Sequence, residues 1–241
     1  MRRFLIAIIT LCCAVELSAQ EVVVVESIEC KPIKESLSSF TAIEVDAPIL
    51  LTLNKLPDGE SPYIIYDTKG CYTSKFTFDV DSKSGMLRIS ERSDSKRESV
   101  TEVSIFFAEL TDMHIAKANV TINGVLDSQL LDIYVSNDAN LKAEIDVLDL
   151  MIVISGKSRI ELSGVTRYQT ADISTAEYDA SKLESVSTIA EASHNAIVRV
   201  DATERLEART STGGKIYYRS QPVILRSEMT LFGGEIMRLK Q

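Results

Sequence analysis

An alternation of apolar and polar residues that recurs at a spacing of about 19 residues constrains the fold of this chain more than any other feature. Four serines mark the spacing, at Ser136, Ser155, Ser174 and Ser193, and Thr212 continues the series. The apolar residues one and three positions before each of the four serines keep in step, and they are Ile133, Val135, Ile152, Ile154, Ala171, Ile173, Ala190 and Ala192. This repeat predicts strands that bury their apolar faces by stacking on the equivalent strands of neighbouring repeats.

A second strand is expected after each turn of the repeat. These second strands are expected at residues 141–145, 160–162, 196–200 and 216–218, with residues 178–181 as a weaker copy. We therefore predict an all-β fold, a right-handed parallel β-helix or β-solenoid of about six coils over residues 111–225, with about 19 residues per coil and coils about 4.8 Å apart. An antiparallel β-sandwich is the alternative, because turns also recur about every 8–12 residues, but it gives no reason for a fixed register.

The chain before the repeats also predicts strands. Residues 43–47 alternate in polarity, and residues 49–53 continue as an apolar strand. Residues 76–80 and 86–90 flank a turn, which is typical of a β-hairpin. We expect this N-terminal β region to cap or extend the solenoid. The three alanines among the in-step residues predict a narrower or less apolar interior in the later coils.

Residues 1–19 have the features of a secretory signal peptide. Two arginines precede an apolar run from Phe4 to Val15, and Ser18 and Ala19 provide the small residues of a cleavage site. The run is too short for a bilayer, which needs about 20 apolar residues, so we expect no transmembrane segment in the mature chain. We divide the chain into a signal peptide (1–19), an extended segment (20–35), one β-solenoid domain (36–225) and a C-terminal strand or cap (226–241).

Charge and cysteine content limit the partners and the redox state. The net charge is −9 over 241 residues. Binding to a nucleic acid is therefore not expected, because it needs a face rich in Lys and Arg. Cleavage would leave two cysteines, Cys30 and Cys71. In an oxidising compartment these either form a disulfide or remain two free thiols, and the sequence favours neither state.

Three short segments resemble a known family. They are residues 40–45 (Phe-Thr-Ala-Ile-Glu-Val), 155–158 (Ser-Gly-Lys-Ser) and 212–218 (Thr-Gly-Gly-Lys-Ile-Tyr-Tyr) followed by Pro222. Over about residues 36–225 the chain resembles the family described as putative auto-transporter adhesin, head GIN domain. The resemblance implies a β-helical envelope protein of Gram-negative type, exported to the periplasm or the cell surface, and it brings no catalytic residues. The turn at residues 174–177 departs from the family pattern, because it lacks glycine, so a regular turn is not expected there.

No set of residues suited to metal or cofactor binding stands out. The two histidines, His114 and His194, lie far apart in the sequence, and no cluster of cysteines accompanies either of them. We therefore predict no metal site, no cofactor and no enzymatic activity.

Three surface residues remain as candidates for a site. Asp172 and Glu191 are acidic neighbours in one column of the repeat, which we expect to continue to Thr210. They fit either an acid–base pair or, as the favoured interpretation, solvated outward charges. Tyr134 lies on the outward side of its strand, where it could stack against a sugar or, as we favour, pack at an edge.

These observations predict an exported, non-catalytic β-solenoid protein that acts in adhesion or as an interaction or scaffold module of the cell envelope. The alternative is a carbohydrate-binding or carbohydrate-active protein of the polysaccharide lyase or hydrolase type, because such enzymes use β-solenoids. The expected partner is an unidentified envelope protein or a glycan. A homo-oligomer formed through the solenoid ends is a further expectation, because unpaired strand edges invite pairing.

Overall fold

The computed structural model describes residues 31–69, 75–92, 99–230 and 232–239, which are mainly β-strands and connecting turns. These ranges contain no α-helix, and therefore none long and apolar enough to cross a membrane. The expected signal peptide (1–19) and the two cysteines Cys30 and Cys71 lie outside the described residues.

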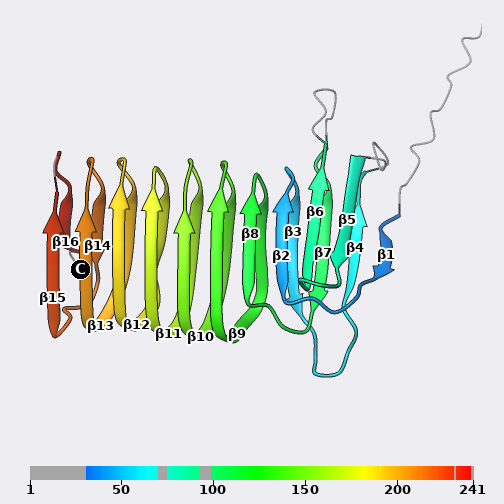
Figure 1. Cartoon of the computed structure of the whole chain (residues 1–241), viewed down its shortest axis with the longest axis horizontal. Coiled ribbons are helices and arrows are strands. Elements are labelled where there is room, and N and C mark those ends of the chain that lie inside the picture. The colour runs from blue at the N-terminus through cyan, green and yellow to red at the C-terminus, as the bar shows by residue number, and fades with distance from the viewer. Residues whose placement is uncertain (1–30, 70–74, 93–98, 231, 240–241) are drawn as a thin grey trace, which may run out of the picture.

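Five long strands form the regular part of the molecule and stack in parallel along its long axis (Figure 1). They are β9 (Asn119–Ser136), β10 (Asn140–Ile154), β11 (Arg159–Ser174), β12 (Glu177–Ser193) and β13 (Ile197–Thr210). Each pairs in parallel with the next, and Ile152 of β10 lies opposite Ala171 of β11, as the spacing of the repeat predicts. The predicted β-solenoid is confirmed, with about seven turns after the N-terminal strands. Parallel pairing excludes the antiparallel sandwich.

The interior row expected from the repeat is present. Val135, Ile154 and Ile173 lie in register on three successive strands, and each is at most 2% exposed. Complete burial of such a side chain stabilises the fold by about 1.5–3 kcal/mol. The stack therefore derives its stability from aliphatic rows that run through the coils.

The turns between coils depend on residues with positive φ. Asn137 and Asp138 take φ angles of 57° and 62°. These residue types tolerate the left-handed region because their side chains can form local hydrogen bonds. The turn at 174–177 is irregular, as expected, with Thr175 at a φ of 59°. Just after it, Glu177 of β12 pairs with Arg159 of β11, which is a shorter step than the regular one.

The N-terminal strands continue the solenoid in an order that the sequence does not reveal. Strands β2 (Ala42–Asp46) and β3 (Leu50–Lys55) pair in parallel with β8 (Asp112–Ala116) and the start of β9. On their other side they pair in parallel with β6 (Met86–Glu91) and β7 (Glu102–Phe107). Strands β2 and β3 therefore lie between two pairs of strands that follow them in the sequence, with β6 and β7 on one side and β8 and β9 on the other (Figure 1).

Antiparallel strands end the stack on the N-terminal side. Strand β4 (Tyr63–Asp67) pairs antiparallel with β7 and with β1 (Ile33–Ser36). Strand β5 (Phe76–Asp81) pairs antiparallel with β6, which confirms the predicted hairpin. The rings of Tyr66 and Phe76 pack together, with centroids 5.1 Å apart. The N-terminal region thus both extends the solenoid and caps it.

Three short strands continue the stack at the C-terminal end. They are β14 (Lys215–Tyr218), β15 (Ile224–Met229) and β16 (Glu235–Arg238). Strands β14 and β15 both pair in parallel with β13, and β16 pairs in parallel with β14.

The regular step of the repeat is not kept between β12 and β13. Glu191 pairs with Arg209, so the expected continuation of its column to Thr210 is wrong. The change in step arises at the corner, the bend between the two straight halves of a coil. There the β12 segment from Ala180 to Ser187 pairs with the shorter β13 segment from Val200 to Arg205. A corner can lose residues because the interior rows fix the register of the straight segments, whereas they constrain the bends between those segments less.

The interior of the later coils holds polar groups as well as alanines. Tyr178 is fully buried, and its hydroxyl accepts a hydrogen bond of 2.5 Å from Gln169 Nε2. The Oε1 atom of Gln169 accepts one of 3.2 Å from the hydroxyl of Thr188. The hydroxyl of Ser185 donates to the carbonyl oxygen of Asp201 at 2.8 Å. A less apolar interior in the later coils is therefore confirmed, and the weak strand copy at 178–181 contributes the largest buried side chain there.

Candidate binding groove

The two carboxylates singled out in the sequence lie side by side on the outer face of the coils. Asp172 of β11 pairs in register with Glu191 of β12. Glu191 Oε1 accepts a hydrogen bond of 2.7 Å from Arg209 Nη1, and this contact raises the pKa of the guanidinium. A carboxylate committed to an arginine is a poor general acid or base. Glu191 is therefore held in an ion pair, and the two carboxylates are not a free acid–base pair.

Tyr134 lies in the same outward column, separated from Asp172 by Val153. Its ring stacks on His114 of β8, with centroids 4.5 Å apart and planes 18° apart. The two rings line a shallow hollow of about 320 Å³. The structure thus brings Tyr134, Asp172 and Glu191 onto one face, but His114 already covers one side of the tyrosine ring.

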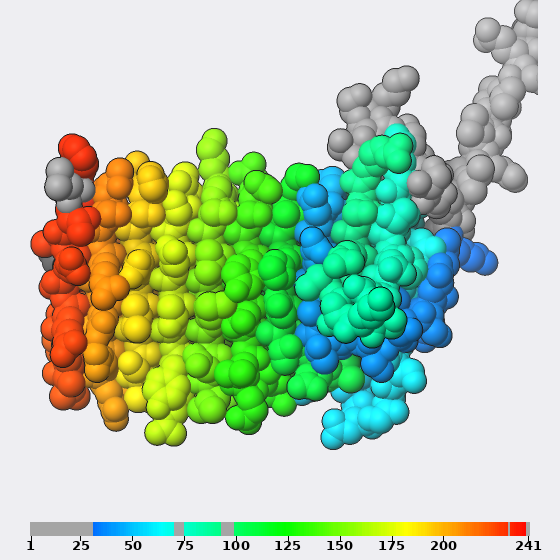
Figure 2. Space-filling model, viewed as in Figure 1, coloured from blue at the N-terminus to red at the C-terminus, as the bar shows by residue number. Residues whose placement is uncertain are grey.

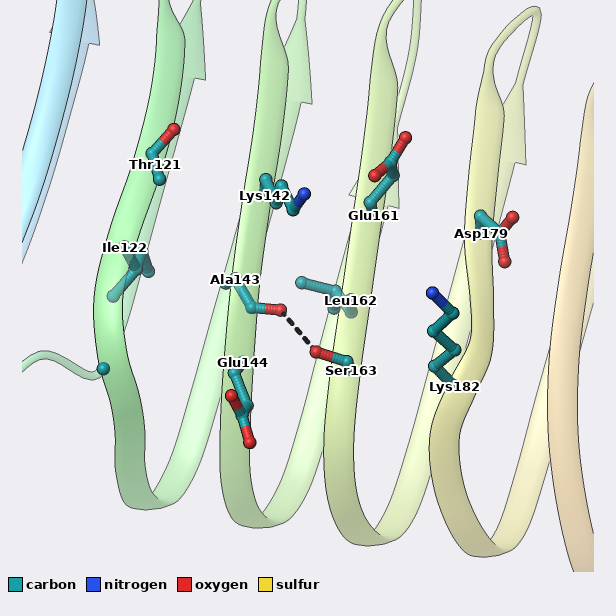
Figure 3. A pocket seen from close by; sticks show the side chains of 11 residues that line it. Thr121, Ile122, Lys142, Ala143, Glu144, Glu161, Leu162, Ser163, Asp179 and Lys182 are labelled. Carbon is teal, nitrogen blue, oxygen red and sulfur yellow. Dashed lines mark hydrogen bonds between the residues drawn. The ribbon is translucent and has the colours of Figure 1, made fainter.

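A different groove, of about 470 Å³, crosses four neighbouring coils on the other half of each long strand (Figure 3). Its lining comes from β9, β10, β11 and β12. Buried Ile122 and Leu162 lie at its base. Between β10 and β11, the hydroxyl of Ser163 donates to the carbonyl oxygen of Ala143 at 3.4 Å (Figure 3).

The groove is formed where the strand register is irregular. Two extra residues of β9 interrupt its pairing with β10 between Lys142 and Glu144. One extra residue of β12 lies between Asp179 and Lys182. Bulges of this kind bend a strand and redirect its side chains. Gly124 takes a φ of 80° in the first bulge, and a side chain there would meet no atom within 4 Å, so the space beside it is open.

Charged side chains from three strands stand around the groove. They are Lys142, Glu144, Glu161, Asp179 and Lys182 (Figure 3). Glu161 forms an ion pair of 3.4 Å with Arg159, and Asp179 accepts a hydrogen bond of 2.7 Å from Ser181. In the part of the chain that the structure describes, the two lysines and Glu144 form no ion pair. The groove therefore offers two ammonium groups and one carboxylate that no described side chain of this molecule neutralises.

This combination of groups suits binding through charge and shape. Each ammonium group can donate up to three hydrogen bonds to an acidic ligand, and the apolar base can contact its carbon skeleton. Among the described residues, no group of three or more His, Cys, Asp or Glu is placed to hold a metal ion.

Sequence reasoning missed the groove because its residues lie at bulges, where the columns of the repeat lose their register. A signal was nevertheless present in Gly124 and Gly164, which interrupt strand patterns at φ angles of 80° and 111°. An isolated glycine inside a strand indicates a bulge or a close approach of two backbones.

The parallel coils and the open groove on their outer face define a β-solenoid protein with an extended outer surface. The chain belongs to the family described as putative auto-transporter adhesin, head GIN domain, whose model matches residues 39–222.

Solved structures share this fold. A putative adhesin from Bacteroides fragilis has a TM-score of 0.76 and 15% identity, over 87% of this chain and 96% of the other. A putative adhesin from Parabacteroides merdae has a TM-score of 0.67 and 16% identity, with the same two coverages. A putative lipid binding protein from Parabacteroides distasonis has a TM-score of 0.66 and 16% identity, again over 87% and 96%. Identities this low show the fold alone. No curated protein matches the chain in sequence.

Proposed function

We propose that this protein is a non-catalytic interaction module of the cell envelope, exported to the periplasm or the cell surface, which acts in adhesion or as a scaffold. The groove carries the proposal, because Lys142 and Lys182 stand on hydrogen-bonded neighbouring coils with no ion-pair partner among the described residues. Membership of a family described as putative adhesins supports a role in binding rather than in catalysis.

The repeated architecture suits contact with an extended partner. Neighbouring coils lie about 4.8 Å apart, so an elongated protein segment or glycan that crosses them meets equivalent positions at a regular spacing. Contacts that are individually weak then add through multivalency. The two lysines of the groove favour a partner that carries acidic groups, such as an acidic envelope protein or an acidic glycan.

A carbohydrate-active role has no comparable support among the described residues. Glu191 is engaged by Arg209, and one face of Tyr134 is covered by His114. The function that we propose is therefore non-catalytic binding, in adhesion or as a scaffold, in which a glycan is a ligand rather than a substrate.

Retention of protein-coated beads under flow tests the proposal. The surfaces are mucin, collagen and purified bacterial cell envelopes, and the variant is Lys182→Glu in the groove. We expect retention on at least one surface and a loss of about fivefold or more in the variant, because electrostatic complementarity governs such contacts.

Lys157→Glu is the matched control, because Lys157 is exposed in a turn and its substitution changes the net charge equally. Retention should survive in this control. Failure of the unchanged protein to bind any of the three surfaces, or equal losses in both variants, would overturn the proposal.

A further inference from the structure

The two ends of the stack differ in the strands that terminate them. At the N-terminal end, the antiparallel strands β1 and β4 lie outside the parallel coils. At the opposite end the stack stops on the parallel strands β15 and β16 (Figures 1 and 2). Within the described ranges β15 pairs with β13 alone, and all six of its residues are exposed. An open edge of this kind is a template for another strand.

Apolar side chains are exposed at this end. They are Val223, Ile224, Leu225, Met229 and Phe232, with Val223 and Phe232 each 83% exposed and Met229 61%. Leu225 and Met229 are in register with buried residues of β13, so they continue its interior rows. Among the described residues, no further coil covers them.

The backbone of β15 is oriented for pairing at its free edge. The Thr230 amide donates to the Thr210 carbonyl oxygen at 3.0 Å, so this position faces β13. Backbone directions alternate along a strand. The N–H and C=O groups of Leu225, Ser227 and Met229 therefore face away from β13, toward the open edge.

The outward side chains of β15 carry opposite charges on either side of Ser227. Arg226 Nη1 lies 3.5 Å from Glu207 Oε1, and Glu228 Oε2 lies 3.5 Å from Arg209 Nε. Arg226 and Glu228 thus extend two ion-pair ladders, one from Glu207 of β13 and one that runs from Glu191 of β12 through Arg209 of β13. Each ladder ends at the open edge on an exposed charge, one positive and one negative.

We propose that this end is a homodimer interface in which β15 pairs antiparallel with β15 of a second copy, about a two-fold axis at Ser227. In this register Arg226 faces Glu228 of the second copy, and Leu225 faces its Met229. The two Ser227 residues exchange backbone hydrogen bonds. The Arg226–Glu228 pairs fall at the non-hydrogen-bonded positions, where side chains are closest.

Charge selects this register over its neighbours. A shift of two residues would set Arg226 opposite Arg226 of the second copy, or Glu228 opposite Glu228, and like charges directly opposite each other are destabilising. In the proposed register each ladder alternates in sign across the junction, from Glu207 through Arg226 to Glu228 and Arg209 of the second copy. A two-fold interface must be self-complementary, and this edge meets that condition.

Proline at the two-fold axis tests the backbone pairing. Ser227→Pro removes an amide that faces the open edge and leaves the bonds to β13 in place, whereas Ser227→Ala keeps the amide. Light scattering and sedimentation over a concentration series should show a dimer of the purified protein. We expect the dimer Kd to rise about tenfold or more in Ser227→Pro and to change about twofold or less in Ser227→Ala.

Charge exchange tests the register and does not depend on the proline variant. Arg226→Glu and Glu228→Arg should each raise the dimer Kd about tenfold, because symmetry doubles each like-charge contact. The double variant restores opposite charges across the junction, although it loses both ion pairs to β13, so its Kd should be lower than that of either single variant. A monomeric unchanged protein, a dimer insensitive to Ser227→Pro, or no recovery in the double variant overturns the proposal.

Discussion

The interior of the solenoid changes character partway along the stack. One inward column begins with Leu131 and Leu150 on β9 and β10, continues with Gln169 and Thr188 on β11 and β12, and returns to Leu206 on β13. The strands pair in parallel throughout. The early coils, those of β9 and β10, are stabilised by aliphatic burial. The middle coils, those of β11 and β12, also bury a chain of hydrogen bonds. A parallel stack therefore accepts polar interior groups when each finds a partner in a neighbouring coil.

The largest effect is expected for a charge placed in the aliphatic coils. Ile154 is 1% exposed, and Ile154→Asp would bury a carboxylate among apolar side chains. We expect a loss of more than about 4 kcal/mol in the free energy of unfolding, enough to abolish cooperative melting. Denaturant unfolding measures this loss. Lys157→Ala, in an exposed turn, should change stability by about 0.5 kcal/mol or less, and similar melting of the two variants would contradict the interior assignment.

A somewhat smaller effect is expected between β10 and β11, where the aliphatic interior meets the hydrogen-bonded one. Gly164 has a φ of 111°, and a side chain there would overlap the carbonyl oxygen of Ile145 on β10. We expect Gly164→Ala to cost about 3 kcal/mol, from backbone strain and displacement of β10. Gly124→Ala is the control, because its φ is also positive but the space beside it is open, so it should cost about 1 kcal/mol. Equal melting temperatures would show that the coils do not approach closely at Gly164.

The hydrogen-bonded interior is tested by removing one hydroxyl. Burial raises the pKa of Tyr178, so this hydroxyl stays neutral. Tyr178→Phe leaves the amide of Gln169 without its partner, and we expect a cost of about 1–3 kcal/mol in chemical denaturation. The exposed Tyr168 provides the control, Tyr168→Phe, which should be nearly neutral. If Tyr178→Phe is also neutral, the middle coils are stabilised by packing alone, as the early ones are.

The smallest effect concerns the outer face of the early coils. Burial raises the pKa of Asp132, and repulsion from Asp112 and Asp149 adds to the shift. A raised pKa means that ionised Asp132 destabilises the folded state at neutral pH. We expect Asp132→Asn to stabilise the protein by about 0.5 kcal/mol at pH 7, after allowance for solvent screening.

The pH dependence of that gain provides its check. The advantage of Asp132→Asn should shrink as the pH falls through the raised pKa of the folded state, and vanish below the ordinary value of 3.8. Thermal melting of both proteins from pH 7 to pH 3 measures the difference. A gain that is independent of pH would show that the carboxylate charge is not its cause.

The repeat made the regular coils predictable from the sequence. Inward residues such as Ile152 and Ile173 recur at the strand period, so their burial and parallel register follow from the pattern alone. The hairpin β5–β6 was predictable because a turn separates two alternating segments. Asp172 and Glu191 were correctly placed as neighbours, because no corner separates their strands from the marker serines.

Features that depend on corners and long-range order were not predictable. The corner before Arg205 is short, which sets Arg209 rather than Thr210 beside Glu191. The groove at Lys142 and Lys182 depends on two bulges, and residue spacing does not show on which strand an extra residue is accommodated. Position in sequence also gave no indication that β2 lies between β6 and β8, because strand order is a tertiary property.

This last arrangement has a consequence for the order in which the chain folds. The hydroxyl of Thr111 donates to the Thr41 carbonyl oxygen across 70 residues, whereas each regular coil pairs with the coil next to it in the sequence. Closing the long connection costs more chain entropy and is slower than local pairing. We therefore expect assembly to wait for the distant pairings of β2 and β3. The later coils would then add one after another, each using the coil just completed as its template.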